Sequence, residues 1–267
     1  MIAIVAIAGL ATVQDGGRAG HMHEGVPPGG PLVPELLARA NAAVRNAHGQ
    51  AAIELMGRIT LEAHHPITIA TDDGDARLLR EGERCTVMMG RARARYIAVR
   101  GGFDVPVVLG GRGTLVVAGL GGHEGRSLRR GDILRAGDSP MAAARTELPA
   151  PPDREGPLRI IPGPDADRFE AQDLVVLLSS TFVIDSRSDR VGIRLTGAGR
   201  LTRPPADIGA SSPMVRGAIQ VPPSGELIVL GPDHPTTGGY PVVATVAHAC
   251  LGALGARPLG AAVRFVK

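Results

Sequence analysis

The apolar stretches of this chain are short, and glycine, proline or aspartate bounds most of them. They are rich in valine and isoleucine, which favour strands, and the bounding residues are those that favour turns. Many short strands separated by turn residues are typical of a β-barrel or β-sandwich. We therefore expect a mainly β protein, with strands at residues 2–7, 59–70, 96–99, 114–117, 158–161, 191–195, 218–221, 227–230 and 262–266.

Two segments, 34–47 and 165–178, follow helical spacing instead. Each begins at or near a proline or an aspartate, which commonly start helices. In each, the apolar residues fall on one helical face. We predict one short helix from each segment, and the apolar positions are Leu36, Leu37, Ala40 and Val44 in the first and Phe169, Leu174, Val175 and Leu178 in the second.

The chain is long enough for one large β domain or two smaller ones. Its 37 glycines and 22 prolines accompany 44% hydrophobic residues, so they are better explained by turns than by disorder. Between the two helical segments, residues 139–157 are rich in alanine, proline and charge and show no alternation. We predict an N-terminal β-rich half at 1–138, a linker at 139–157 and a C-terminal β-rich half at 158–267, each half barrel-like with one short helix.

Composition argues against several functions. The net charge is only +3, there is no tryptophan and aromatic residues are 2%, which disfavours a nucleic-acid binder. Cys85 and Cys250 lie too far apart in sequence for a zinc or redox motif, and we expect no metal site and two free thiols in a reducing compartment. The apolar run at 2–13 is too short to span a bilayer, so we expect a first strand and a cytoplasmic protein without membrane contact.

The densest polar cluster of the first half is Thr12-Val-Gln-Asp-Gly-Gly-Arg18. Glycines beside Asp15 and Arg18 would let the backbone bring both charges close to a ligand. A turn pinned by an ion pair between these two residues explains the pattern equally well. A second glycine-rich loop, 101–113, carries Arg112 and is either an anion cradle or, more simply, successive hairpin turns.

The second half contains two polar motifs. Ser188, Asp189 and Arg190 fall in a turn between predicted strands, where they either bind a ligand or bond within the turn. The sharper motif joins Gly217-Ala-Ile-Gln220 to Asp233-His-Pro-Thr-Thr-Gly-Gly-Tyr-Pro241. A hairpin would explain its glycines, but the paired threonines favour a binding role. Its candidate residues are Gln220, Thr236, Thr237, Gly238 and Tyr240.

On these motifs the chain resembles the family called allophanate hydrolase subunit two, or KipA-type proteins, which includes the C subunit of 5-oxoprolinase and a region of urea carboxylase. The matching segments run nearly from end to end, and they are 12–15, 96–102, 105–110, 179–180, 188–192, 217–223 and 236–241. The sequence departs from the family pattern at three loops, 29–33, 111–114 and Pro235. These loops lack side chains that the pattern carries, which bears on the substrate.

The resemblance implies cyclophilin-like β-barrel architecture and a site completed by a partner, which is a KipI-like protein or the B subunit of 5-oxoprolinase. The lactam-hydrolase A subunit is a further candidate partner. The resemblance also implies either ATP-dependent opening of 5-oxoproline to glutamate or carboxyl transfer from biotin to an amide or ureido group. ATP or carboxybiotin would reach the site through partner subunits, since neither a phosphate-binding loop nor a biotinylation motif is present.

On this hypothesis Asp15, Asp189 and Tyr240 are catalytic. The substrate would be bound by Arg18, Ser188, Arg190, Gln220, Thr236, Thr237 and Gly238. All of them are predicted to line one cavity. The alternative is a non-catalytic KipA-type protein that binds and antagonises a KipI-like kinase inhibitor.

Overall fold

The computed structural model describes residues 1–138, 147–197, 199–202, 204 and 211–267. The chain divides into two compact units. Unit 1 comprises residues 1–19 and 29–152, and unit 2 comprises residues 20–28 and 153–267. The predicted linker at 139–157 includes residues 139–146, which lie outside the described residues, so its boundaries remain a prediction.

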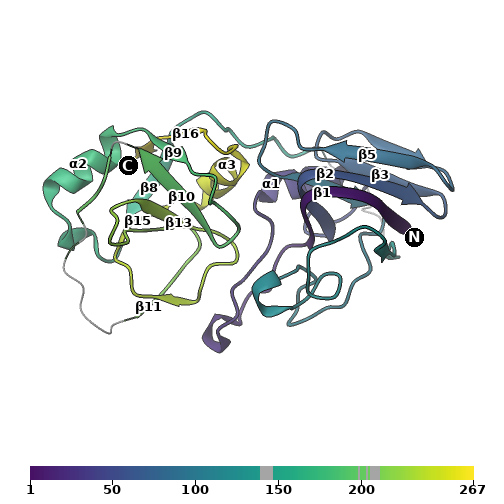
Figure 1. The fold of residues 1–267 in the computed structure, drawn as a ribbon, viewed down its shortest axis with the longest axis horizontal. Helices are drawn as coiled ribbons and strands as arrows, with labels where there is room; N and C mark the ends of the chain where they lie inside the picture. Colours follow the sequence, from purple (N-terminus) through teal and green to yellow (C-terminus); the bar gives the residue numbers. More distant parts are fainter. Residues whose placement is uncertain (139–146, 198, 203, 205–210) are drawn as a thin grey trace. The chain divides into compact units, whose positions relative to one another are not determined.

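In unit 1 the described residues form a seven-stranded sheet with the order β4-β3-β6-β2-β1-β7, and β5 pairs with the far end of β2. Figure 1 shows the long strands β1 and β2 side by side. Unit 1 contains β1 (Ile2–Gln14), β2 (Ala52–Ala63), β3 (Ile67–Thr71), β4 (Ala76–Leu79), β5 (Arg84–Met88), β6 (Arg95–Val99), β7 (Ile133–Leu134), the helix α1 (Pro34–Ala43) and the helical turn η2 (Val116–Ala118).

Strand β1 covers the whole apolar run 2–13 in which a first strand was expected, well beyond the Val/Ile-rich residues 2–7, and a pair of glycines lies at its least buried part. Gly9 lies opposite Gly57 in the β1–β2 ladder, and both have positive φ. A Cβ added to Gly9 would lie 2.2 Å from the Met56 carbonyl oxygen. Beyond this point β1 is buried from Ala11 onward, which brings the Thr12-Val-Gln end of the strand into the core.

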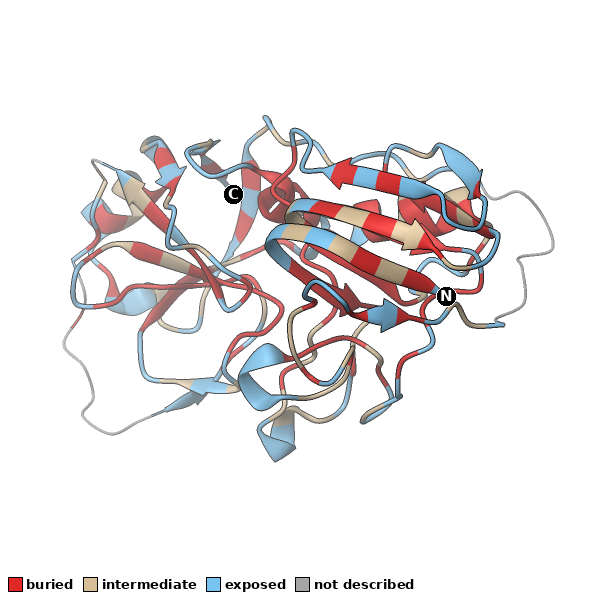
Figure 2. Ribbon diagram, turned by 45° about the vertical axis from the view of Figure 1, so that its right-hand side comes forward, coloured by how far each residue is buried: buried red, intermediate tan, exposed pale blue. Residues whose placement is uncertain are grey.

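Buried and exposed residues alternate along β5, whereas the first four residues of β2 are all buried (Figure 2). Helix α1 starts with Pro34 in its first turn and buries Leu36, Leu37 and Ala40. It ends at Ala43, earlier than the predicted 47, and Arg45 follows with a left-handed φ of 63°. Two strand predictions are wrong here: residues 64 and 65 form a turn between β2 and β3, and 114–117 contains η2 rather than a strand.

In unit 2 the described residues form an eight-stranded sheet with the order β16-β9-β10-β13-β12-β15-β8-β17. Its two outermost strands, β16 and β17, are separated in sequence by Arg264 alone. Such a sheet must curl until its two edges nearly meet, as in a barrel. The strands are β8 (Leu158–Pro162), β9 (Phe182–Ile184), β10 (Gly192–Gly197), β12 (Ala218–Gln220), β13 (Leu227–Leu230), β15 (Val242–Val246), β16 (Ala262–Val263) and β17 (Phe265–Val266).

Unit 2 also contains a two-stranded sheet of β11 (Ser212–Pro213) and β14 (Thr237–Gly238). Helix α2 (Ala171–Ser179) is shorter than the predicted 165–178, because the first residues form a separate turn at Ala166–Arg168. A third helix, α3 (Leu251–Ala256), was not predicted, since its sequence is small and apolar on all sides. The prediction of a mainly β protein is confirmed.

Candidate functional site

Asp15 and Arg18 both hold the glycine-rich loop of unit 1. Asp15 directly follows β1, and its Oδ1 accepts hydrogen bonds from the amides of Gly17 (2.9 Å) and Gly113 (3.1 Å), while Oδ2 accepts one from the amide of Arg112. The Arg18 guanidinium donates to the carbonyl oxygens of Val108 (3.3 Å) and Gly113. Both side chains are buried. Arg18 thus bonds to the loop backbone, and not to Asp15 as the ion-pair interpretation expected.

The loop itself follows the hairpin-turn interpretation. Val108 and Gly111 form a bridge, and the Arg112 side chain donates to the Val105 carbonyl oxygen and lies 3.6 Å from the Asp104 carboxylate. A Cβ at Gly113 would lie 2.9 Å from Gln14 Oε1 and 3.0 Å from Asp15 Oδ1. The glycine at 113, one of the departures from the family pattern, therefore permits the close approach of this loop to the Asp15 carboxylate.

In unit 2 the turn 185–190 is held by its own side chains. Asp189 is exposed, and its Oδ1 accepts the amides of Val191 and Gly192, both at 2.9 Å. Ser188 Oγ accepts the amide of Arg194 at 3.0 Å. The Arg187 guanidinium donates two hydrogen bonds to Asp185 and lowers the pKa of that carboxyl to about 2.

Arg190 makes a buried ion pair that the sequence motif did not reveal. Its Nε and Nη2 donate to the two carboxylate oxygens of Asp233 at 2.7 and 2.9 Å. Side-chain exposure is 7% for both residues, so the pair is largely out of water. Two parallel bonds of this kind fix both side chains in one geometry. The pair ties the 185–190 turn to the loop after β13.

The remaining predicted residues surround β14. Gln220, at the end of β12, is buried and donates from Nε2 to the Met214 sulfur at 3.2 Å. A Cβ at Gly238 would lie 2.9 Å from that nitrogen, so this glycine leaves room for the Gln220 amide. The Thr236 carbonyl oxygen accepts the amide of Met214, while Thr237 and Tyr240 are exposed. The structure therefore brings Gln220, Thr236, Thr237 and Gly238 together.

His234 belongs to the same motif but was not among the predicted site residues. Its exposure is 0%, and Nδ1 lies 2.8 Å from the Pro235 carbonyl oxygen. Burial lowers the pKa of this imidazole. The motif could have suggested this residue, because a histidine lies between the aspartate and the paired threonines. The motif gave no indication that the histidine is buried.

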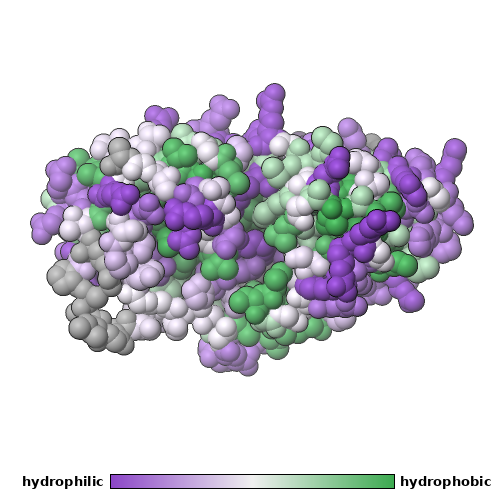
Figure 3. Space-filling model, viewed as in Figure 1, coloured by the Kyte–Doolittle hydropathy of each residue, from purple (hydrophilic) through white to green (hydrophobic). Residues whose placement is uncertain are grey.

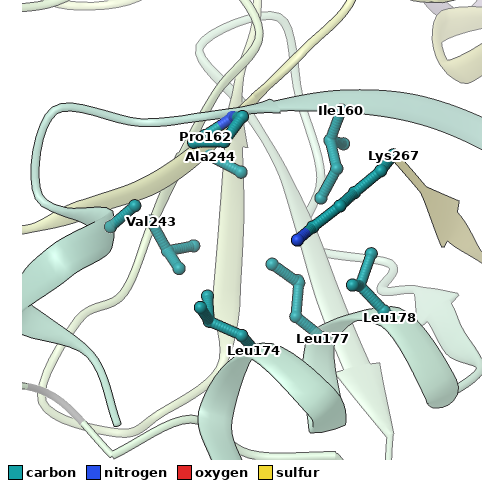
Figure 4. A pocket seen from close by; sticks show the side chains of 9 residues that line it. Ile160, Pro162, Leu174, Leu177, Leu178, Val243, Ala244 and Lys267 are labelled. Carbon is teal, nitrogen blue, oxygen red and sulfur yellow. The ribbon is translucent and has the colours of Figure 1, made fainter. Parts of the chain in front are cut away.

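Two cavities lie within single units, and neither is lined by a predicted site residue. One, in unit 2, is apolar and holds about 50 Å³, and the side chain of Lys267 points toward Leu177 (Figure 4). That volume is far below the several hundred Å³ typical of a small-molecule site. The other, in unit 1, holds about 640 Å³ beside Arg45, Arg77 and Arg100. Leu148 also lines this cavity.

Within the described ranges, no three histidine, cysteine, aspartate or glutamate side chains gather as metal ligands would. None of the helices in the described part of the chain is both long enough and apolar enough to cross a lipid bilayer.

Predicted site residues thus lie in both units, each of which is described by itself. Asp15 and Arg18 belong to unit 1, and Ser188, Asp189, Arg190, Gln220, Thr236, Thr237, Gly238 and Tyr240 belong to unit 2. That all of them line one cavity stays a prediction.

Comparison with protein families identifies the chain. The model of the carboxyltransferase domain, subdomain A and B, matches residues 24–267. The chain belongs to this carboxyltransferase-domain family. It is 34% identical to the 5-oxoprolinase C subunit of Escherichia coli (strain K12), across 100% of this chain and 91% of that protein. The resemblance noted from the motifs is confirmed.

Solved structures of related proteins share the fold of this carboxyltransferase-domain chain. The crystal structure of the protein TTHA0988 superposes with a TM-score of 0.83 at 28% identity, covering 100% of this chain and 56% of that one. The Kluyveromyces lactis urea carboxylase superposes with a TM-score of 0.86 at 24% identity, covering 99% of this chain and 27% of that one. The chain thus spans about half of the first structure and about a quarter of the second.

Proposed function

We propose that this chain is the C subunit of an ATP-dependent 5-oxoprolinase, which opens the lactam of 5-oxoproline to glutamate. The observation that carries the proposal is full-length similarity to a 5-oxoprolinase C subunit, of which 91% is covered. By contrast, the similar region of the Lachancea kluyveri urea amidolyase is 16% of that protein, at 29% identity. Similarity to the 5-oxoprolinase C subunit therefore extends over far more of the relative than similarity to the urea amidolyase does.

Within this proposal, the polar groups around β14 bind the lactam. Thr236 and Thr237 carry hydroxyl groups that donate to a carbonyl oxygen, and Gln220 can exchange its weak bond to the Met214 sulfur for a stronger acceptor. Tyr240 stands at the exposed end of the motif. Asp15 is a poorer candidate for a proton acceptor, because both its oxygens already accept backbone amides.

A partner protein is part of the proposal, and unit 1 presents a surface for one. Four exposed apolar side chains, which we call the loop patch, lie within the loop 101–113 or just after it: Val107 (59% exposed), Leu109 (39%), Val116 (49%) and Val117 (80%). Leu109 also adopts a left-handed φ of 52°, which is uncommon for a bulky residue. Figure 3 shows apolar side chains gathered over the teal helical turn of Figure 1.

The test is reconstitution. The chain is co-expressed with its candidate partners, a KipI-like protein and a lactam hydrolase, and glutamate release from 5-oxoproline is measured with and without ATP. We expect turnover only with ATP and only with all three proteins present. Transfer of carboxyl from carboxybiotin to urea, without glutamate release, would instead assign the chain to the carboxyltransferase branch.

The loop patch also favours a second candidate, a non-catalytic KipA-type protein that antagonises a KipI-like kinase inhibitor, because such a protein needs only a partner surface. Tight binding of the partner, no turnover in any mixture of the three proteins, and relief of kinase inhibition would support it.

A further inference from the structure

His234 is held in one tautomer by its own loop. Its Nδ1 lies 2.8 Å from the Pro235 carbonyl oxygen. A carbonyl oxygen only accepts hydrogen bonds, so Nδ1 carries the proton and donates. In the neutral imidazole the other nitrogen, Nε2, is then a bare acceptor with its lone pair in the ring plane.

That acceptor has no donor among the described residues. Nε2 exposes less than 1 Å² and makes no hydrogen bond, and the whole side chain is 0% exposed. Buried polar atoms nearly always have a partner, because leaving one unpaired costs free energy. The neighbouring buried carboxylate of Asp233 shows the usual state, because both its oxygens accept hydrogen bonds from Arg190. An unmatched acceptor in this loop therefore calls for a donor from a ligand or from water.

Burial keeps the ring neutral. It is the largest influence on the pKa of His234 and lowers it. The hydrogen bond to the Pro235 carbonyl oxygen raises this pKa, and the nearby positive charge of Arg216 lowers it. The Asp233 carboxylate acts in the opposite direction, but Arg190 already neutralises it. At neutral pH His234 is therefore available as an acceptor and not as a donor.

The sequence around the ring is the basis on which we infer the chemistry of the donor. His234 lies between the buried Asp233 and the segment that carries Thr236 and Thr237, and the Thr236 carbonyl oxygen is bonded to the amide of Met214. His234 thus offers an acceptor for an N–H group. Two and three residues later, Thr236 and Thr237 offer hydroxyl groups that can donate to a carbonyl oxygen. A lactam or ureido group presents both features on adjacent atoms.

We propose that Nε2 of His234 binds the substrate by accepting a hydrogen bond from the N–H of its lactam or ureido group. This rests on the proposed function for the choice of substrate, and it adds a specificity-determining residue to that site. It predicts that analogues whose ring nitrogen carries a methyl group bind poorly.

Two substitutions of His234 test the roles of Nδ1 and Nε2 separately. His234→Asn keeps an amide N–H near Nδ1, so the bond to the Pro235 carbonyl oxygen can persist, but it removes the acceptor at Nε2. His234→Gln reaches the Nε2 position with an amide oxygen and gives up the bond to the loop. In the reconstituted complex we expect His234→Asn to raise KM for 5-oxoproline about tenfold, with kcat changed less than about threefold, and His234→Gln to regain part of this loss.

A structural role would reverse this order: His234→Asn would match the wild-type KM, and His234→Gln would be the impaired variant. That result overturns the proposal, as does an equal KM for all three proteins.

Imidazole ¹⁵N NMR of the wild-type chain in its complex tests the same atom without any substitution. Addition of imidazolidin-2-one, a cyclic urea, should shift the Nε2 resonance of His234, whereas 1,3-dimethylimidazolidin-2-one, which has no N–H, should not. An unchanged resonance with both compounds means that Nε2 is paired with an internal water, and the proposal fails. If the wild-type complex releases no glutamate, the proposed function fails, and this titration still decides the role of His234.

Discussion

Unit 1 and unit 2 each bury an arginine and an aspartate from a sequence motif, but they pair them differently. In unit 1, Asp15 accepts hydrogen bonds from N–H groups of the loop backbone, and Arg18 donates to carbonyl oxygens of the same loop, so the two side chains do not form an ion pair. In unit 2, Arg190 and Asp233 bond directly to each other in two parallel hydrogen bonds. The first arrangement shapes a loop, and the second joins two loops and leaves the neighbouring His234 acceptor unmatched.

The difference matters for function because similar motifs need not have similar roles. The Asp15 carboxylate accepts three backbone amides and so holds the loop in place, and its catalytic role stays a prediction. An unpartnered acceptor beside a satisfied ion pair is better placed to bind a ligand. Four substitutions test this difference between the two units, and they follow in order of decreasing expected effect.

The largest effect is expected from Arg190→Met. This change leaves the Asp233 carboxylate buried without its partner, which typically lowers the free energy of unfolding by about 3–5 kcal/mol. Chemical denaturation measures it. The double variant Arg190→Met/Asp233→Leu should recover most of the loss, since it buries no lone charge. Arg187→Met is the comparison, because the Arg187 side chain in the ion pair with Asp185 is 58% exposed. Equal stability of the two variants would contradict the proposed importance of burial.

Asp15→Asn comes next, at about 1.5–3 kcal/mol, because an amide group replaces one of the carboxylate oxygens that accept backbone N–H groups. Denaturation and turnover should be measured on the same protein. We expect turnover per folded complex to fall no more than it does for the matched control Asp104→Asn, whose carboxylate makes a single weak ion pair at 3.6 Å. A stable but inactive Asp15→Asn variant would restore Asp15 as a catalytic residue.

Val117→Asp tests the loop patch. Its side chain is 80% exposed, so the folded chain without its partner should change in stability by less than about 0.5 kcal/mol. Its affinity for the KipI-like partner should fall about tenfold or more, which isothermal titration calorimetry measures. Val175→Asp is the control, because Val175 is 54% exposed on α2 of unit 2. If both variants bind equally well, the partner docks elsewhere.

The smallest effect concerns the exposed turn. Removing the guanidinium in Arg187→Ala should raise the pKa of Asp185 from about 2 toward its usual value near 3.9. A lowered folded pKa stabilises the protein above the unfolded pKa, and this contribution disappears as pH falls through about 2. Wild type and variant should therefore differ most above about pH 4 and converge in stronger acid. NMR titration of the Asp185 carboxyl carbon checks the shift.

Much of the fold could be predicted because most strands are short Val/Ile runs between turn residues. The prediction failed where apolar residues are not core residues. Val116 and Val117 are exposed and form a helical turn, so their β-branched side chains were misleading. Strand β4 was missed for the opposite reason: it lies at the sheet edge, and three of its four residues are exposed.

The candidate site was harder to predict because its decisive contacts join distant residues. Arg190 and Asp233 are 43 residues apart, and the Asp15 carboxylate meets an amide 98 residues away. Local motifs indicated polar residues of the right kind but could not show which of them were already paired. Nor could they show that His234 is buried with one nitrogen unmatched, since no apolar pattern around this residue indicates burial.

The assignment of residues 20–28 to unit 2 affects how this protein can be divided. Cutting the polypeptide at one position, even at the boundary between Pro152 and Asp153, would leave the C-terminal fragment without nine residues that belong to its unit. Chimaeras that exchange halves between relatives therefore need two crossover points around residues 20–28 as well as one near 152. During synthesis, residues 20–28 are made more than a hundred residues before the rest of unit 2, so unit 2 cannot be completed from its C-terminal part alone.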